Sequence, residues 1–305
     1  MSPLSAAWSL VVRGWHLTFD TGLRQPTRVA GAQVVSVGNL VVGGAGKTPV
    51  VIHLANEAMR RGYRVAVLTR GYGRTSREEL HITAATLRPV EEVGDEPRLI
   101  ARRCPGVTVW VGADRVSLAR QAIAGGANLL LLDDGFQHRR LARDVDVLVD
   151  GGEGNGWVLP AGPLREPASH RARATHLWGR DGREGDVTAL HHTRTVRAPD
   201  GVEHPLATLV GKPLTLLLGI ARPERVVESL RDAGLTVKAV HAHADHHVFT
   251  AAELDAARRD ASDGLLVTTE KDAERLAPGS AWVLIHDVEV KNAKRHPLDA
   301  LKAAT

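Results

Sequence analysis

The segment from Val34 to Thr48 constrains the fold more than any other part of the chain. A short β-branched run ends at Val37, a glycine-rich loop follows, and the loop closes on Gly46-Lys47-Thr48 before an amphipathic helical pattern. A strand, a glycine-rich loop and a helix in this order are typical of a phosphate-binding loop. The usual spacing would place a further glycine five residues before Gly46, where this chain has Val41.

Each residue of this loop receives a predicted role. Gly43, Gly44, Ala45 and Gly46 would turn backbone N–H groups toward the phosphates of ATP, and Lys47 would reach the β- and γ-phosphate oxygens. The Thr48 hydroxyl group would bind Mg²⁺. Only 7 of the 39 Lys and Arg residues are Lys, so composition alone does not readily explain a lysine at this position.

Short apolar runs alternate with helical patterns as far as residue 149. Such runs predict parallel strands that helices cover on both faces. We therefore predict an α/β fold, with a doubly wound, mostly parallel sheet of the P-loop NTPase type as the nucleotide-binding domain over residues 25–155. The predicted strands are 34–37, 65–68, 107–111, 129–132 and 145–149, and the predicted helices are 48–61, 96–103 and 115–124.

A glycine-rich stretch at residues 151–156 interrupts the pattern and marks the predicted domain boundary. After a polar stretch at 171–205 the alternation resumes, which predicts a second, smaller α/β domain over residues 156–305. Ligands of open α/β sheets bind beyond the carboxyl ends of the strands, so the two domains should enclose an active-site cleft. The predicted strands of the second domain are 214–218, 236–240, 264–268 and 281–285.

A buried strand that delivers two aspartates predicts a metal site. The apolar run at 127–132 is followed by Asp133-Asp134-Gly135-Phe136-Gln137-His138. A carboxylate held beside a phosphate-binding loop is the usual ligand of Mg²⁺ and its waters. The sequence leaves open which of Asp133 and Asp134 contacts the ion.

Two further residues admit both a structural and a chemical interpretation. Asp95 stands two residues before Pro97 at a predicted helix start, where a capping role is sufficient to explain it. His246 lies in a loop of a chain with 15 histidines, where a solvated side chain is the default and no regular ligand spacing favours zinc. Arg70 and Arg165 could grip a phosphate group or lie on the surface.

The N-terminal segment, residues 1–24, carries apolar residues at helical spacing, including Trp8 and Trp15. Either the helix packs on the domain or it lies at a membrane surface. Arg13 interrupts the apolar run and argues against a signal peptide. No stretch reaches the ~18 apolar residues of a membrane span.

Charge and cysteine content narrow the functional class only slightly. The formal net charge of +4 suits nucleic acid, anionic lipid or phosphorylated substrates about equally. A single cysteine, Cys104, permits neither an internal disulfide nor a multi-cysteine metal site, which suits the cytoplasm.

Eight motifs, read together in chain order, resemble the tetraacyldisaccharide 4′-kinases, also called lipid A 4′-kinases. The family pattern also carries its loop glycines only from the position of Gly43 onward, which accounts for Val41. The motifs are Val37-Gly38-Asn39 with Gly43–Val50, Arg70–Gly73, Gly94–Pro97, Asp133–His138, Asn155–Pro167, Gly219–Ala221, Asp245-His246 and Thr269–Ala273.

The resemblance implies phosphorylation of the 4′-hydroxyl group of a lipid A disaccharide 1-phosphate by ATP and Mg²⁺. It places the protein peripherally at the cytoplasmic face of the inner membrane, with no nucleic acid partner, and we expect a monomer. It also implies that Asp95 and His246 act together in catalysis with Lys47. The candidates for substrate binding are Arg70, Arg115, Gln137, His138 and Arg165.

A different functional class stays open from the loop motif alone. A nucleotide-driven switch would use the same loop to control partner or membrane binding without phosphorylating an acceptor. Its dimerising ATPase form carries lysine just before the paired glycines, where this chain has Val42. A kinase with a water-soluble acceptor is a further alternative.

Overall fold

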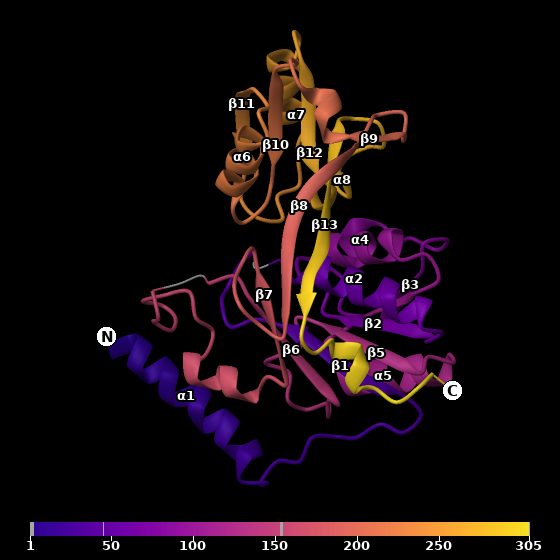
Figure 1. Cartoon of the computed structure of the whole chain (residues 1–305), viewed down its shortest axis with the longest axis vertical. Coiled ribbons are helices and arrows are strands. Elements are labelled where there is room, and N and C mark those ends of the chain that lie inside the picture. Colours follow the sequence, from indigo (N-terminus) through magenta and orange to yellow (C-terminus); the bar gives the residue numbers. More distant parts are fainter. Residues whose placement is uncertain (1–2, 45, 153–154, 305) are drawn as a thin grey trace.

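The computed structural model describes residues 3–44, 46–152 and 155–304. Within these residues the strands form one sheet, with β9 paired to β8 outside the main path. Figure 1 shows that helices gather around each end of this sheet, while two long strands run from one end to the other. The predicted α/β class with a mostly parallel sheet is confirmed. The main path has the order β11-β10-β12-β13-β8-β7-β6-β1-β5-β2-β4-β3.

The first half of the sheet centres on β1 (Gln33–Gly38), which pairs in parallel with β5 and β6. A short edge strand, β3, is antiparallel to β4. The other strands of this half are β2 (Val65–Thr69), β3 (Leu80–Ile82), β4 (Thr108–Val111), β5 (Leu129–Asp133), β6 (Val145–Asp150) and β7 (His176–Arg180).

Alternating residues of β2 enter two different cores, because successive side chains of a strand point to opposite faces. Val65 and Val67 pack with α2 (Lys47–Arg60) and α4 (Asp95–Arg103). Ala66 and Leu68 pack with α5 (Arg115–Ala124) on the other face. The short helix α3 (Val90–Val93) precedes α4. The sheet is therefore covered on both faces, as predicted.

The second half repeats the arrangement on a smaller scale. β10 (Leu214–Leu218) pairs in parallel with β11 (Val237–Ala242) and β12 (Leu265–Thr269). Leu216 and Leu218 face one core with Leu230, and Leu217 faces another with Ala257. The helices are α6 (Pro223–Asp232), α7 (Ala251–Asp260) and α8 (Glu270–Ala273), with 3-10 turns at Ala168–Arg173, Leu206–Leu209 and Pro297–Ala300.

Two long antiparallel strands, β8 (Val187–Arg197) and β13 (Trp282–Ala293), connect the halves. The sequence analysis read residues 171–205 as a polar stretch and ended the last strand at residue 285. β8 was not predicted, because His, Thr and Arg occupy most of its half-exposed positions and leave no apolar run. The short strand β9 (Glu203–Pro205) extends this ribbon.

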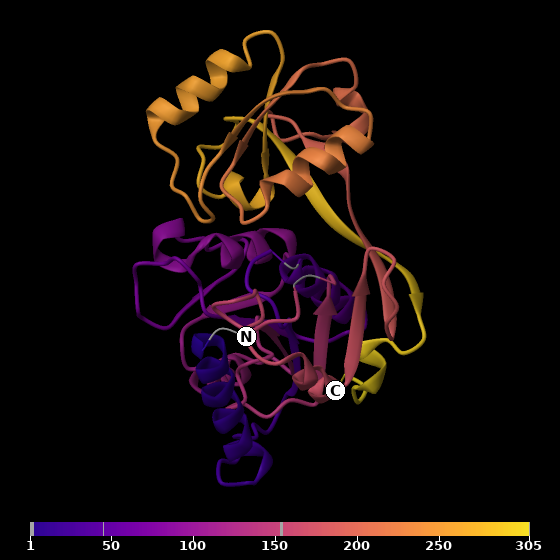
Figure 2. The same ribbon diagram turned by 90° about the vertical axis from the view of Figure 1, so that its left-hand side faces the viewer.

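Some residues beyond the predicted boundary at 151–156 pack with the first half. β7 continues its sheet by pairing with β6, and Leu298 enters the core that contains Val145 and Trp178. A sequential boundary could not anticipate this, because the chain crosses to the second half along β8 and returns along β13 (Figures 1 and 2).

The N-terminal helix α1 (Pro3–Asp20) lies beside the first half of the sheet (Figure 1). Its inward side buries two polar residues, Ser5 and His16, together with Phe19. Its apolar side faces outward, with Leu10 70% and Leu17 58% exposed. No helix within the described residues combines the length and the apolar character that crossing a membrane requires.

Candidate active site

A cleft of about 820 Å³ lies between the two halves of the molecule. The first half contributes the phosphate-binding loop with Lys47 and Thr48, and the second half contributes His246 and Lys271. Figure 2 shows the two halves facing each other across this region. The structure thus has the predicted cleft between its two α/β halves, and the phosphate-binding loop lines it.

The phosphate-binding loop follows β1 and ends at the first turn of α2. Gly46, the N-cap of α2, has φ 74°, a left-handed backbone that glycine adopts without steric cost. A Cβ atom at Gly46 would lie 2.9 Å from His191 Nδ1, so the close approach also requires glycine. Gly43 has φ 92°. Gly44 lines the cleft, and Ala45 lies outside the described residues.

The Lys47 ammonium group is held between two side chains. Its Nζ lies 3.2 Å from Asn39 Oδ1 and 3.4 Å from Asp134 Oδ1. Asn39 is fully buried, and its contact with Lys47 could not be predicted from the motif Val37-Gly38-Asn39 alone. These contacts aim Lys47 into the cleft, where charge on a transferred phosphoryl group would develop.

The two aspartates that follow β5 lie in different environments. Asp133 is buried and accepts a hydrogen bond from Thr69 Oγ1 at 3.0 Å, and burial together with the charges of Glu96 and Asp134 raises its pKa to about 7. Asp134 lines the cleft. Burial raises the pKa of Asp134, but Lys47 and Arg165 outweigh this effect and hold it below its ordinary value.

These residues fit a divalent cation bound with phosphate. Asp134 Oδ1 lies 3.4 Å from the Lys47 ammonium group, and Asp134 lines the cleft together with Thr48. An ionised carboxylate oxygen and a hydroxyl group are oxygen ligands of the kind that Mg²⁺ prefers. Asp134 is thus better placed than Asp133 to reach an ion in the cleft.

Asp95 is the first residue of α4 and is 1% exposed. The N-cap position belongs to Gly94, and among the described residues the donor to Asp95 Oδ1 is its neighbour, Glu96 N, at 2.9 Å. Asp95 Oδ2 instead faces His246 Nδ1 at 3.2 Å and forms an ion pair with Arg275. Capping alone therefore does not account for this buried carboxylate.

His246 has a left-handed backbone with φ 64°, which a non-glycine residue rarely adopts. Its Nε2 lies 3.3 Å from Lys271 Nζ, and the Tyr72 ring lies 5.0 Å from its ring. Burial and the charge of Lys271 lower the pKa of His246, which favours the neutral imidazole. A neutral imidazole has one donor and one acceptor nitrogen and is able to relay a proton.

Two cations beside Asp95 and His246, Lys271 and Arg275, were not predicted from the sequence. Lys271 was quoted in a motif without a role, and its Nζ lies 2.8 Å from Asp245 Oδ1 and 3.9 Å from Asp95 Oδ2. Arg275 lies just beyond that motif and is paired with Asp95. Their spacing of four residues, one helical turn after β12, is the signal that could have placed both on one side.

The candidates for substrate binding do not all reach the cleft. Arg165 lines it and donates to Asp134 Oδ2 at 2.7 Å. Arg70 is exposed after β2, and Arg115 is buried, donating to the Gly112 carbonyl group at 2.7 Å. Gln137 donates to the Asn39 carbonyl group behind the loop. His138 is half-buried, and burial together with Arg115 lowers its pKa to about 4.

Comparison with known proteins agrees with this geometry. The family described as "Tetraacyldisaccharide-1-P 4′-kinase" matches residues 1–303. A tetraacyldisaccharide 4′-kinase of Anaeromyxobacter dehalogenans (strain 2CP-C) is 45% identical over 293 residues, which cover 86% of this chain and 77% of that protein. One from Gluconobacter oxydans is 42% identical over 263 residues, which cover 83% and 79%.

A solved structure has the same fold. The crystal structure of LpxK from Aquifex aeolicus in complex with ATP superimposes with a TM-score of 0.78 and 29% sequence identity, covering 95% of this chain and 93% of that one. The family match spans residues 1–303 and so includes the phosphate-binding loop and Asp95, and each of the two relatives covers more than four fifths of the chain. The chain belongs to the tetraacyldisaccharide-1-phosphate 4′-kinase family.

Proposed function

We propose that this protein transfers the γ-phosphoryl group of ATP to the 4′-hydroxyl group of a tetraacyldisaccharide 1-phosphate, the lipid A precursor. One observation carries the site assignment. His246 lines the same cleft as the phosphate-binding loop, and the buried Asp95 contacts its imidazole. Membership of the kinase family supports the reaction, and nothing in the family match favours a nucleotide-driven switch.

The phosphate-binding loop would hold the ATP phosphates. Backbone N–H groups of Gly43–Gly46 would surround phosphate oxygens, and Lys47 would stabilise charge on the transferred group. Thr48 and Asp134 would hold Mg²⁺, with Asp133 behind them. Bound Mg²⁺ would neutralise charge on the β- and γ-phosphates.

Asp95 and His246 would activate the sugar hydroxyl group that accepts the phosphoryl group. Asp95 Oδ2 would accept the hydrogen bond, and then the proton, of the sugar hydroxyl group whose oxygen attacks phosphorus. With its own proton on Nε2, His246 would then take that proton from Asp95 at Nδ1 and return Asp95 to its ionised form. The charge of Arg275 compensates the buried carboxylate, which would otherwise be costly in this environment.

This arrangement depends on the relative position of the two halves. Asp95 begins α4 in the first half, whereas His246 follows β11 in the second. Opening of the cleft would separate the pair, and closure would assemble it around the substrate. Arg165, which reaches Asp134 from the rim of the cleft, is the best-placed candidate to grip a substrate phosphate.

We further propose that α1 binds the protein to the cytoplasmic face of the inner membrane. The outward side of α1 carries Leu4, Leu10, Val11 and Leu17, each more than half exposed. An amphipathic helix with such a face is typical of a peripheral protein that lies at a lipid surface. From the membrane surface the enzyme would reach its lipid substrate. We retain the expectation of a monomer that binds no nucleic acid.

The reaction is tested directly with purified protein, Mg·ATP and lipid A disaccharide 1-phosphate in detergent micelles. We expect the bisphosphorylated product by mass spectrometry and ATP turnover that requires the lipid. ATP turnover at the same rate without the lipid, with no new product, would instead indicate a nucleotide-driven switch.

Membrane binding is tested with anionic phospholipid vesicles. Leu10→Ser with Leu17→Ser should lower vesicle partitioning at least about tenfold, because each buried leucine contributes about 1.5–3 kcal/mol. The matched control is Val202→Ser, an exposed valine in the loop between β8 and β9. Equal partitioning of wild type and double variant would overturn the assignment of α1.

A further inference from the structure

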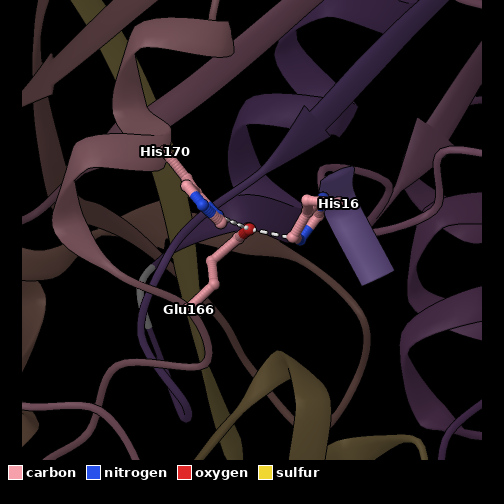
Figure 3. Close-up of side chains that lie close together, drawn as sticks. All are labelled: His16, Glu166 and His170. Carbon is pink, nitrogen blue, oxygen red and sulfur yellow. Dashed lines mark hydrogen bonds and ion pairs between the residues drawn. The ribbon is translucent and has the colours of Figure 1, made fainter. Parts of the chain in front are cut away.

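A buried carboxylate connects α1 with the body of the protein. Glu166 is 0% exposed, and its Oε2 lies 2.8 Å from both His16 Nε2 of α1 and His170 Nδ1 (Figure 3). Neither His16 nor His170 has a role in the proposed reaction. The cluster therefore needs a separate explanation.

The three side chains resemble a metal site, but a side-chain cation already occupies the position. Arg173 Nη2 donates to Oε1 of Glu166 at 2.9 Å and to Oε2 at 2.8 Å, and its Nη1 lies 2.6 Å from His16 Nδ1. Burial raises the pKa of Glu166, but the hydrogen bond from His16 and the charge of Arg173 lower it to about 2. Glu166 is thus an ionised, fully partnered anchor for α1.

The same carboxylate also reaches the phosphate-binding loop. Gln137 Nε2 donates to Glu166 Oε1 at 2.8 Å and to the Asn39 carbonyl group at 2.8 Å. Asn39 Oδ1 in turn accepts from Lys47 Nζ at 3.2 Å. One continuous network of hydrogen bonds thus runs from His16 to Lys47.

Arg165, the residue before Glu166, provides a second connection between α1 and the phosphate-binding loop. Trp8 Nε1 of α1 donates to the Arg165 carbonyl group at 3.0 Å. The Arg165 backbone N–H donates to the Leu40 carbonyl group at 2.7 Å, and its side chain donates to Asp134. Arg165 therefore contacts both α1 and Asp134, while Glu166 contacts α1 and reaches Asn39 through Gln137.

We propose that Glu166 is a positioning residue through which docking of α1 holds Asn39 and Lys47 in their active arrangement. The proposal rests on the proposed function, since it assigns α1 a second task besides binding the membrane. If docking positions the loop, loss of docking slows phosphoryl transfer even where no bilayer is present, because small displacements of a reacting group are costly.

The test uses the full chain with lipid substrate in detergent micelles, so that vesicle binding plays no part. His16→Leu and Glu166→Gln should lower kcat at least about tenfold with little change in KM for the lipid. His16→Gln, which keeps a donor toward Glu166, should recover most of the rate. The matched control is Arg13→Gln, an exposed residue of the same helix that should keep wild-type kcat.

Thermal unfolding is measured in parallel, and rates are compared where every variant is folded. A folded His16→Leu whose kcat is within twofold of wild type would overturn the proposal and leave Glu166 a structural anchor. If His16→Leu does not fold, Trp8→Phe decides instead. It removes the hydrogen bond from Trp8 Nε1 to the Arg165 carbonyl group, and unchanged kcat for this variant would likewise overturn coupling through α1.

Binding of a fluorescent ATP analogue separates this proposal from the proposed function. The measurement needs no acceptor, and we expect weaker binding by His16→Leu than by Arg13→Gln. Wild-type protein that binds the analogue but forms no lipid product would contradict the proposed function, while the comparison of these two variants would still decide the coupling.

Discussion

His246 Nδ1 lies 3.2 Å from Asp95 Oδ2, although 151 positions separate the two residues in the chain. One comes from a helix start in the first half of the sheet and the other from a loop in the second. Arg275 contacts both, at 2.9 Å from His246 Nδ1. The pair therefore belongs to neither half alone, and its chemistry depends on how the halves pack.

Replacement of Asp95 by asparagine should lower kcat by roughly 10²–10⁴-fold, the usual effect of removing a general base. KM for ATP should change little, because Asp95 has no contact with the phosphate-binding loop among its hydrogen bonds and ion pairs given above. Steady-state kinetics with the lipid substrate would measure both quantities.

Asp114→Asn is the matched control for this substitution. Asp114 also stands at a helix start, where it accepts hydrogen bonds from Val116 N and Ser117 N and caps α5. Asparagine caps about as well as aspartate, so the control should keep wild-type kcat. If Asp95→Asn kept wild-type kcat, helix capping would be sufficient to explain Asp95.

The contact between Asp95 and His246 also predicts non-additive kinetics. His246→Ala should lower kcat by a smaller factor in the Asp95→Asn background than in the wild type. Residues that act as a unit lose most of their joint effect on kcat when either one is removed. A double-mutant cycle on kcat measures this coupling. Additive losses would mean that the two residues have separate roles.

Lys47→Ala should lower kcat at least about 100-fold while the protein stays folded, because it removes a cation aimed at the transferred phosphoryl group. Circular dichroism would monitor the fold. Lys212→Ala, which removes a lysine beside Trp282 in the second half, serves as the control and should leave kcat unchanged. If Lys47→Ala kept more than about a tenth of wild-type kcat, the phosphate-binding assignment would be wrong.

Stability should depend on pH through His286 on the wall of the cleft. Burial and the charge of Arg180 lower its pKa to about 4, so the folded protein keeps this imidazole neutral where the unfolded chain protonates it. Between about pH 4 and 6.5 the unfolded state binds more protons, and the free energy of unfolding falls as pH falls.

From pH 7 to pH 5 this group should remove about 2 kcal/mol from the free energy of unfolding. His286→Gln lacks the titrating ring and should lose correspondingly less over the same interval. Urea unfolding of both proteins at the two pH values provides the measurement, and the difference isolates His286 from other titrating groups. If the free energy of unfolding fell equally in the two proteins, His286 would not be the source of this pH dependence.

Local patterns in the sequence were sufficient for the elements around the nucleotide loop. The run before Gly38 became β1 and the pattern after Gly46 became α2, because a strand, a glycine-rich turn and an amphipathic helix each depend on neighbouring residues. β8 was not predicted, since a half-exposed strand with polar residues on both faces carries no apolar periodicity. The roles of Asp95, His246 and the metal ligands remain predictions that the kinetic experiments test.

The sequence by itself determined the fold class, the phosphate-binding loop and, through its ordered motifs, the kinase family. Only the tertiary structure decided which side chains meet. Arg275 joins Asp95 across 180 positions, and Glu166 joins α1 to the loop of Lys47. Spacing along the chain predicts contacts within one helical turn or one strand pair, whereas these contacts arise from the packing of distant segments, which no local periodicity encodes.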